Sequence, residues 1–365
     1  MTDPSRIRVG VVGGTRLPGN VRTLLRNVRN LLESHPVTFE MDLVINDSVN
    51  LPQGFTPVDP GFADTDRALG TLKTLTSGLI EYGKAHEVDI LFQVTKFPVH
   101  GFATAVAGKV TDTPVLTRLA GDNFREYRVS SERLQAVKAF GLNNIMGRVP
   151  LYWSDRIIVL GPHGRSEIAR RNGDIPISEI PQPIDFEQFR RIPQEIEQEI
   201  RNKLGFPSRE RVLLTVGRLT ERKGMGTLIE TAENLSERGQ LFHWYVIGKG
   251  PMREELGNTN GVETLGRIPF EQITDYYHAS DIVVHPSFIE GLPNVLLEAS
   301  ACGTPTLARE VGDSAMVASA TFSDDEELLD LLRKEHEPAE LPEGFDPNRL
   351  EEAYAEAILR TIRDH

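Results

Sequence analysis

Apolar, β-rich runs that end at glycine and lead into helical patterns recur along this chain. Arg6 to Val12 is followed by Gly13-Gly14, Arg211 to Val216 by Gly217, and Phe242 to Ile247 by Gly248. Helices are expected between further strands at Val37–Ile45, Asp89–Val94, Pro114–Leu119 and Arg156–Leu160. Such alternation is typical of parallel sheets covered by helices. Because 365 residues exceed one ordinary core, the pattern predicts two doubly wound α/β domains.

Cysteine content and hydropathy exclude several classes of protein. Cys302 is the single cysteine, so a disulfide framework is excluded and a reducing cytoplasm is expected, with Cys302 as a small buried apolar residue. No apolar run approaches the length of a membrane span, and residues 1–8 lack a signal-peptide core. We therefore expect a cytoplasmic protein that is at most peripheral to a membrane.

The charge is unevenly distributed along the chain. Residues 1–185 hold 21 Lys and Arg against 20 Asp and Glu, a net charge of +1. Residues 186–365 hold 19 against 33, a net charge of −14, and the two add to the total of −13. An acidic total argues against nucleic acid as a partner. The near-neutral first half, with Arg22, Arg26 and Arg29 on one predicted helix, is better suited to contact an anionic membrane surface.

The stretch from His285 to Ala308 contains the densest motif in the chain. A short buried strand ends just before Pro286-Ser287, a loop carries Glu290, and an apolar helix begins at once and bears Glu298. In parallel sheets, loops after the strands bind ligands at the carboxyl edge. Two carboxylates eight residues apart could therefore face one ligand, although a solvated helix glutamate and a turn glutamate would have the same spacing.

Together with Gly291 and Gly303-Thr304-Pro305, this stretch resembles the Glu-x7-Glu signature of retaining, family 4 glycosyltransferases of the GT-B fold. The resemblance implies that Glu290 binds the hydroxyls of a donor sugar. It also implies that the amides of Gly291 and Leu292 approach the sugar and phosphate, and that Glu298 accepts bonds from the ribose.

A second stretch, Gly217-Arg218-Leu219 followed by Lys223-Gly224, resembles the diphosphate-binding signature of the same family. Fixed cations stabilise the negative charge that develops on a departing diphosphate, so the resemblance implies transfer without a metal or cofactor. The alternative is an exposed pair of cations. Val262 to Ile268 resembles the segment that binds the nucleotide base, with Arg267 and Ile268 as candidates.

The first glycine loop, at Gly13-Gly14, follows a strand and precedes an amphipathic helix. Its sequence does not match G-x-G-x-x-G, so the dinucleotide fingerprint fails and a dehydrogenase is disfavoured. In the family that the chain resembles, this loop faces the donor diphosphate. Bare backbone N–H groups at glycine suit that place, whereas a tight turn without a ligand is the alternative.

The acceptor side of the site is less clearly marked. Many members of the family carry a histidine where this chain has Ala120, so no catalytic histidine can be assigned by resemblance. Asp122 is the nearest group able to bind a hydroxyl, unless it caps a turn. Arg118 and Asn123 are its neighbours, and His100 is a further candidate for contact with the acceptor.

Two other segments require an interpretation. Asp64-Thr65-Asp66 matches a metal motif of a different glycosyltransferase fold, but its position between Pro60-Gly61 and a helical stretch favours a capping cluster. No His, Cys or Asp cluster has metal-ligand spacing. Phe140 to Trp153 is expected to form a helix that packs on the sheet, and an amphipathic segment that touches lipid is the alternative.

The resemblance implies the GT-B fold, with two Rossmann-like domains. We expect residues 1–184 to form the acceptor-side domain, on which a terminal helix at 347–365 packs, and residues 185–346 to form the donor-binding domain. The resemblance implies transfer of a sugar from a nucleotide-diphosphate donor to a surface-glycan or lipid-linked acceptor, with retention at the anomeric carbon. A sugar-nucleotide epimerase, a phosphorylase and a non-catalytic nucleotide-sugar-binding partner remain alternatives.

Overall fold

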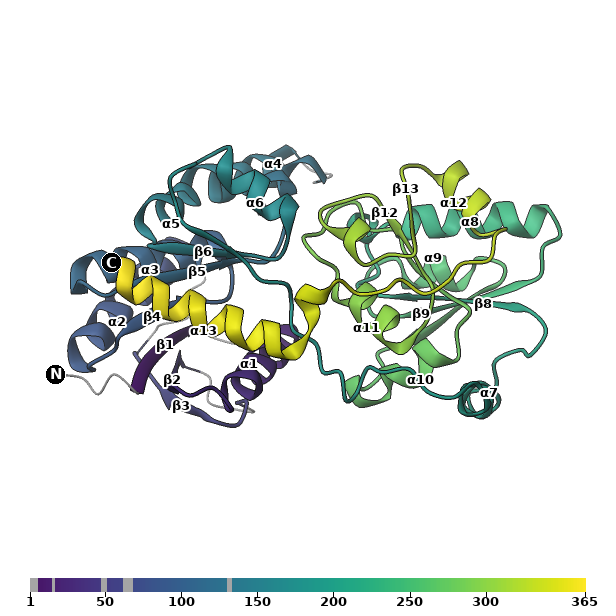
Figure 1. Ribbon diagram of the computed structural model, residues 1–365. Coiled ribbons are helices and arrows are strands. Elements are labelled where there is room, and N and C mark those ends of the chain that lie inside the picture. Colours follow the sequence, from purple (N-terminus) through teal and green to yellow (C-terminus); the bar gives the residue numbers. More distant parts are fainter. Residues whose placement is uncertain (1–5, 15–16, 47–50, 62–67, 130–132) are drawn as a thin grey trace. The chain divides into compact units, whose positions relative to one another are not determined.

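The computed structural model describes residues 6–14, 17–46, 51–61, 68–129 and 133–365 (Figure 1). The chain divides into two compact units. Unit 1 comprises Met1–Pro183 and Glu343–His365, and unit 2 comprises Ile184–Pro342. Each unit is built on one parallel sheet with its own helices, which confirms the prediction of two Rossmann-like α/β domains.

The sheet of unit 1 has seven strands in the order β3-β2-β1-β4-β5-β6-β7, all parallel. The strands are β1 (Arg6–Gly14), β2 (Thr38–Ile45), β3 (Phe55–Val58), β4 (Ile90–Gln93), β5 (Val115–Leu119), β6 (Arg156–Val159) and β7 (Ile177–Glu179). The central strands match the apolar runs of the sequence. The edge strands β3 and β7 were not predicted, because they are short and only partly buried.

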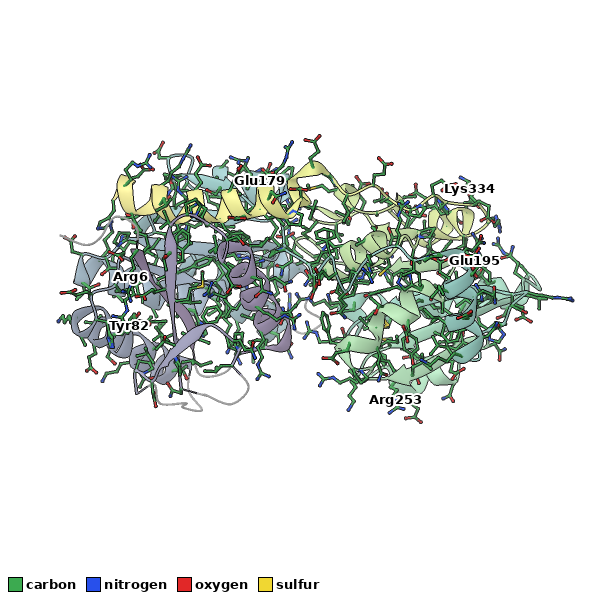
Figure 2. The ribbon with its side chains drawn as sticks, turned by 60° about the horizontal axis from the view of Figure 1, so that its bottom comes forward. Arg6, Tyr82, Glu179, Glu195, Arg253 and Lys334 are labelled. Carbon is green, nitrogen blue, oxygen red and sulfur yellow. The ribbon has the colours of Figure 1, made fainter. Side chains whose placement is uncertain are left out.

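The helices of unit 1 are α1 (Gly19–Leu32), α2 (Ala68–Ala85), α3 (Phe97–Thr111), α4 (Arg133–Phe140), α5 (Arg148–Trp153), α6 (Pro162–Ala169) and α13 (Pro347–Asp364). The carboxyl-terminal helix α13, yellow in Figure 1, lies beside α1. Its buried Leu350, Tyr354 and Ile358 join the core with residues of α1 and β1. On α2, Tyr82, labelled in Figure 2, donates a hydrogen bond of 2.7 Å to the buried Asp42 of β2.

The segment from Phe140 to Trp153 differs from the single sheet-packing helix expected from the sequence. α4 ends at Phe140, a π-helical turn follows over Gly141–Met146, and α5 begins at Arg148. Pro150 and Leu151 are buried, but Phe140, Leu142, Ile145, Tyr152 and Trp153 are exposed. The expectation is wrong for most of the segment, because alternating apolar and polar residues do not show which face a helix buries.

The sheet of unit 2 has six parallel strands in the order β10-β9-β8-β11-β12-β13. The strands are β8 (Arg211–Val216), β9 (Phe242–Ile247), β10 (Val262–Gly266), β11 (Ile282–His285), β12 (Thr306–Arg309) and β13 (Ala320–Phe322). The helices are α7 (Gln194–Lys203), α8 (Met225–Glu237), α9 (Arg253–Gly257), α10 (Ile273–His278), α11 (Asn294–Cys302) and α12 (Asp325–Leu331).

Two buried clusters, built around Trp244 and Tyr277, fill the space between the sheet of unit 2 and its helices. The indole of Trp244 donates a hydrogen bond of 3.0 Å to Thr215 on the neighbouring strand β8. Cys302 is buried as expected, and burial raises the pKa of its thiol to about 12. β8 and β11 are paired neighbours in this sheet, so the loops after them begin side by side at its carboxyl edge.

Candidate active site

A cation and a carboxylate meet where β8 and β11 end. Lys223, in the 3₁₀ turn after β8, donates a hydrogen bond to Oε1 of Glu290, in the loop after β11. The same oxygen lies 3.0 Å from Nε2 of His285, the last residue of β11. Both predicted signatures of unit 2 therefore converge on one carboxylate.

Gly224 allows the turn that carries Lys223 to lie close to the loop that carries Glu290. Gly224 has a φ of +74°, and a Cβ placed there would lie 2.1 Å from the carbonyl oxygen of Pro286. Next to this contact, the amide of Phe288 donates a hydrogen bond of 3.1 Å to the carbonyl of Arg222. The turn that carries Lys223 is thus held against the loop that carries Glu290 by backbone contacts.

The surroundings of Glu290 keep it ionised. Burial alone would raise the pKa of Glu290, but the hydrogen bonds and charges of His285 and Lys223 outweigh it, so the pKa lies well below its ordinary value. An ionised carboxylate can only accept hydrogen bonds. Glu290 is therefore suited to accept them from hydroxyl groups of a ligand at this edge of the sheet.

Glu298 lies about one turn into α11 and has a different environment. Its Oε2 accepts a hydrogen bond of 2.8 Å from the hydroxyl of Tyr277, on α10. Burial raises the pKa of Glu298 to about 7, although the bond from Tyr277 acts in the opposite direction. Burial and the nearby Glu298 also raise the pKa of Tyr277 well above its ordinary value. Two glutamates eight residues apart therefore differ strongly in acidity.

The remaining donor-side candidates of unit 2 lie in loops at the carboxyl ends of its strands. Arg218, directly after β8, is exposed and forms no ion pair with any described residue. Leu292 is buried, and Gly291 accepts a hydrogen bond of 2.7 Å from the amide of Asp313. After β10, Arg267 is exposed, whereas Ile268 packs against the core around Tyr277.

Two residues that support this site were missed in the sequence. His285 stands directly before the Pro286-Ser287 motif, and its place at the end of a buried strand was a signal that could have identified it. Arg309, at the end of β12, donates to Thr227, Ser323 and Asp325, and its guanidinium lies 4.4 Å from the ring centroid of Phe288. Nothing in its local sequence distinguishes Arg309 from a surface residue.

In unit 1 the structure brings the glycine loop and His100 together. Gly13 and Gly14 are the last residues of β1 rather than a loop after it, because β1 continues its pairing with β2 through an irregularity at this point. A Cβ on Gly14, whose φ is +76°, would lie 2.3 Å from Cε1 of His100. His100 is buried, lies 2.5 Å from the hydroxyl of Thr95 through Nδ1, and has its pKa lowered to about 3 by burial and then by Lys96.

Asp122 has partners inside unit 1. Its Oδ2 lies 3.1 Å from Nε2 of His163 and 3.9 Å from Nε of Arg125. His163 is the second residue of α6, after the next strand along the sheet, and no local sequence pattern indicated this pairing. The structure therefore provides a histidine close to Asp122, although Ala120 occupies the place of the histidine found in many members of the family.

Arg118 and Asn123, the neighbours of Asp122 in sequence, lie in different environments. Arg118 is buried, donates to Gln182, and lies beside Tyr354 of α13. Asn123 is half-buried at the start of a 3₁₀ turn, Asn123–Val129. The contacts of Arg118 point toward the interior of unit 1, so its acceptor role stays a prediction.

Among the described residues, no group of three His, Cys, Asp or Glu side chains is placed to hold a metal ion. Asp64 and Asp66, interpreted above as a capping cluster, lie outside the described residues. Within the described part of the chain, no helix has both the length and the apolar character to cross a membrane.

Comparison with solved structures identifies the fold class. Sucrose-phosphate synthase from Thermosynechococcus elongatus has a TM-score of 0.73, with 19% identity over 98% of this chain and 95% of that one. Anabaena Alr3699/HepE in complex with UDP-glucose has a TM-score of 0.62, with 17% identity over 98% and 97% of the two chains. Two Rossmann-like units of this kind define a protein of the GT-B fold.

The sequence identifies the family. Residues 210–364, which include the whole cluster around Glu290, match the glycosyl transferases group 1 family. Over 257 residues the chain is 30% identical to a protein of Bacillus subtilis (strain 168) named for teichuronic acid biosynthesis as glycosyltransferase TuaC. Residues 210–364 of the chain therefore belong to the glycosyl transferases group 1 family. The match to TuaC covers 67% of this chain and 61% of that relative, so the chain spans about three fifths of its length.

Proposed function

We propose that this protein is a retaining glycosyltransferase that moves a sugar from a nucleotide-diphosphate donor to a glycan or lipid-linked glycan acceptor. The proposal rests on the hydrogen bond that Lys223 donates to Glu290 at the carboxyl edge of the unit 2 sheet. It joins a cation that can bind a diphosphate to an ionised carboxylate that can bind sugar hydroxyls. Both residues lie within the part of the chain that matches the family.

Binding of the diphosphate is assigned to Arg218 and Lys223. Arg218 is exposed and has no ion-pair partner among the described residues, so its guanidinium is available to an anion. Lys223 forms an ion pair with Glu290, and a diphosphate would give its ammonium group a second anionic partner. The complex of HepE with UDP-glucose supports a donor of this class. Fixed cations of this kind would stabilise the leaving group without a metal ion or a cofactor.

The two glutamates are assigned to the two sugars of the donor. Glu290 would accept bonds from hydroxyls of the transferred sugar, and Glu298 from those of the ribose. The amide N–H groups of Gly291 and Leu292 have no acceptor within the described chain, which leaves them available to the sugar and phosphate. Arg267 and Ile268, after β10, are assigned to the base.

In the single-step route proposed here, the acceptor attacks from the side that the diphosphate leaves, and the configuration at the anomeric carbon is retained. The bond between the anomeric carbon and the diphosphate oxygen breaks through an oxocarbenium-like state, and a bond to the acceptor oxygen forms. The proton of the acceptor hydroxyl passes to the departing diphosphate oxygen, so this step requires no histidine at position 120. Exclusion of water from the site would prevent hydrolysis of the donor.

Unit 1 is assigned to the acceptor. The backbone N–H groups of Gly13 and Gly14, at the end of β1, are the exception and are assigned to the donor diphosphate. His100 lies beside Gly14, and Asp122 follows the carboxyl end of β5 with His163 as its partner. These groups can bind hydroxyls, and Asp122 is the acceptor-side carboxylate proposed for the reaction. A lipid-linked acceptor would require unit 1 to contact the membrane at its periphery.

Native mass spectrometry with a panel of nucleotide sugars tests the proposal directly. One nucleotide sugar should bind the wild-type protein, and Glu298→Ala should weaken that binding. Turnover of the same donor should require an acceptor extract, should give a product with the anomeric configuration of the donor, and should continue in excess chelator. Release of free nucleotide without an acceptor would indicate an epimerase, and a requirement for phosphate would indicate a phosphorylase. Binding without turnover would contradict the enzymatic proposal.

A further inference from the structure

A cationic cavity of about 600 Å³ lies in unit 1. Its walls come from the 3₁₀ turn after β5, the segment from α4 to α5, and α6. Its lining contains five arginines, namely Arg125, Arg128, Arg148, Arg170 and Arg171.

Glu167 is the one carboxylate among the described lining residues, and it organises part of the arginine cluster. It is buried and bonds Arg125 at 2.6 Å, Arg170 at 3.0 Å and Arg171 at 2.8 Å. Burial would raise the pKa of Glu167, but the bonds and charges of Arg171 and Arg125 lower it below its ordinary value. Asp122, outside the lining, lies 3.9 Å from Arg125. Two carboxylates cannot balance five guanidinium groups, so the cavity retains an excess of positive charge.

Two of the arginines are available to a ligand. Arg128 and Arg148 are exposed, and neither forms an ion pair with any residue that the structure describes. Phe124, Tyr127 and Phe140 supply aromatic walls between the cations. Guanidinium groups bind phosphate oxygens in pairs of parallel hydrogen bonds, which makes phosphate the chemistry best matched to this lining.

The exposed hydrophobic side chains of residues 134–153 form the apolar surface, and two of them, Phe140 and Ile145, also line the cavity. Seven of the eleven large hydrophobic side chains that are exposed in the described chain lie between residues 134 and 153. Leu134, Val137 and Ile145 are 66%, 69% and 65% exposed, and Tyr152 and Trp153 lie at the end of the same segment. Exposed apolar and aromatic residues beside basic ones are typical of segments that lie in a membrane interface.

The net charge of the whole chain bears on whether unit 1 can contact an anionic membrane surface. A protein with a net charge of −13 is repelled by an anionic surface unless a cationic region faces it. The arginine cavity and the exposed Arg133 and Lys138 of α4 place such a region beside the apolar surface. Cations and apolar side chains therefore gather on one part of unit 1.

From these observations we propose that the arginine cavity binds the phosphate of a membrane lipid while the apolar surface of residues 134–153 enters the lipid layer. This inference deepens the proposed function, on which it rests, by assigning a phosphate-bearing lipid to the acceptor side. It places membrane contact at the arginine cavity rather than on the arginines of α1.

Vesicle flotation with the full chain tests the proposal. The protein should partition onto phosphatidylcholine vesicles that contain phosphatidic acid at least tenfold more strongly than onto phosphatidylcholine alone. Arg128→Gln with Arg148→Gln should reduce that partition by about 10- to 30-fold, the scale expected for losing two basic residues at an anionic surface. Arg349→Gln with Arg360→Gln, two arginines on or beside α13 in exposed ion pairs, is the matched control and should leave it unchanged.

A second pair of variants tests the apolar surface. Leu134→Ser with Ile145→Ser should reduce the partition at least fivefold, whereas Val110→Ser, at a side chain of unit 1 that is 53% exposed, should not. Equal partition onto the two kinds of vesicle, or partition unchanged by the arginine substitutions, would overturn the proposal. Binding of glycerol phosphate without binding of vesicles would also overturn it.

Nucleotide-sugar binding, measured on the same samples, separates the two proposals. The arginine variants should bind the nucleotide sugar as the wild type does, because no residue assigned to the donor lines the arginine cavity. If the wild type binds nucleotide sugar but no phosphatidic acid vesicles, the lipid inference fails and the proposed function stands. If it binds the vesicles but no nucleotide sugar, the proposed function fails.

Discussion

Lys223 donates a hydrogen bond to Glu290 across 67 residues of sequence, and the contact joins the turn after β8 to the loop after β11. Each residue affects the other, one through its ionisation and one through its position. The ammonium group helps to keep the carboxylate ionised in a partly buried site, and the carboxylate fixes the ammonium at the edge of the sheet. Replacement of either residue therefore affects both a charge and a position.

Lys223→Ala should lower turnover of the donor by roughly 10²-fold or more, the scale for removal of one preorganised group that stabilises developing charge. Glu290 would keep its bond to His285, so the loop should keep its shape. Single-turnover kinetics with the identified nucleotide sugar would measure the effect. Lys334→Ala, at an exposed residue of unit 2 labelled in Figure 2, is the control. Unchanged turnover in Lys223→Ala would remove this residue from the mechanism.

Glu298 should make stability depend on pH. Its pKa is about 7 in the folded protein against an ordinary value of 4.5, so the folded state binds the proton more tightly than the unfolded chain. This contribution to stability is fully present below about pH 4.5 and is lost as the pH rises through about 7. From pH 5 to pH 8, the wild type should lose roughly 1–3 kcal/mol relative to Glu298→Gln.

Urea unfolding of both proteins across this pH range would measure the difference. Tyr277→Phe provides a second test, because the Tyr277 hydroxyl lowers the pKa of Glu298. Without that hydroxyl, the pH at which the difference develops should move upward. A difference between wild type and Glu298→Gln that is the same at pH 5 and pH 8 would contradict the raised pKa.

The sequence predicted the fold, and the meeting of Lys223 with Glu290, better than the surroundings of the candidate site residues. Strand–glycine–helix repeats are local patterns, so β8 and β9 were assigned with the bounds that the structure has. The environments of Glu290 and Glu298 depend on His285 and Tyr277, whose positions follow from packing rather than from local pattern. The arginine cavity was missed for the same reason, since its lining is contributed by segments spread from Phe124 to Arg171.

Gly14→Ala should destabilise unit 1. The substitution would place a Cβ 2.3 Å from the buried His100 at a residue whose φ is +76°. Left-handed strain and overpacking together are expected to cost about 2–4 kcal/mol of unfolding free energy. Gly61→Ala is the matched control, because its φ is +69° and no described atom lies within 4 Å of the added Cβ. If urea unfolding gave the two variants equal stability, the contact with His100 would not constrain position 14.

Gly224→Ala should reduce both stability and turnover. The added Cβ would lie 2.1 Å from the carbonyl oxygen of Pro286, which is backbone and cannot move without the loop that carries Glu290.

Gly205→Ala separates this contact from backbone strain, because its φ of +73° nearly equals the +74° of Gly224 and its Cβ would meet nothing within 4 Å. The control should lose only about 1 kcal/mol and keep its turnover. Gly224→Ala should lose more stability and at least tenfold in turnover, since misplacement of a catalytic group by about 1 Å can cost 10²-fold. Equal effects of the two substitutions on turnover would show that the approach of Gly224 to Pro286 does not position Lys223 for the reaction.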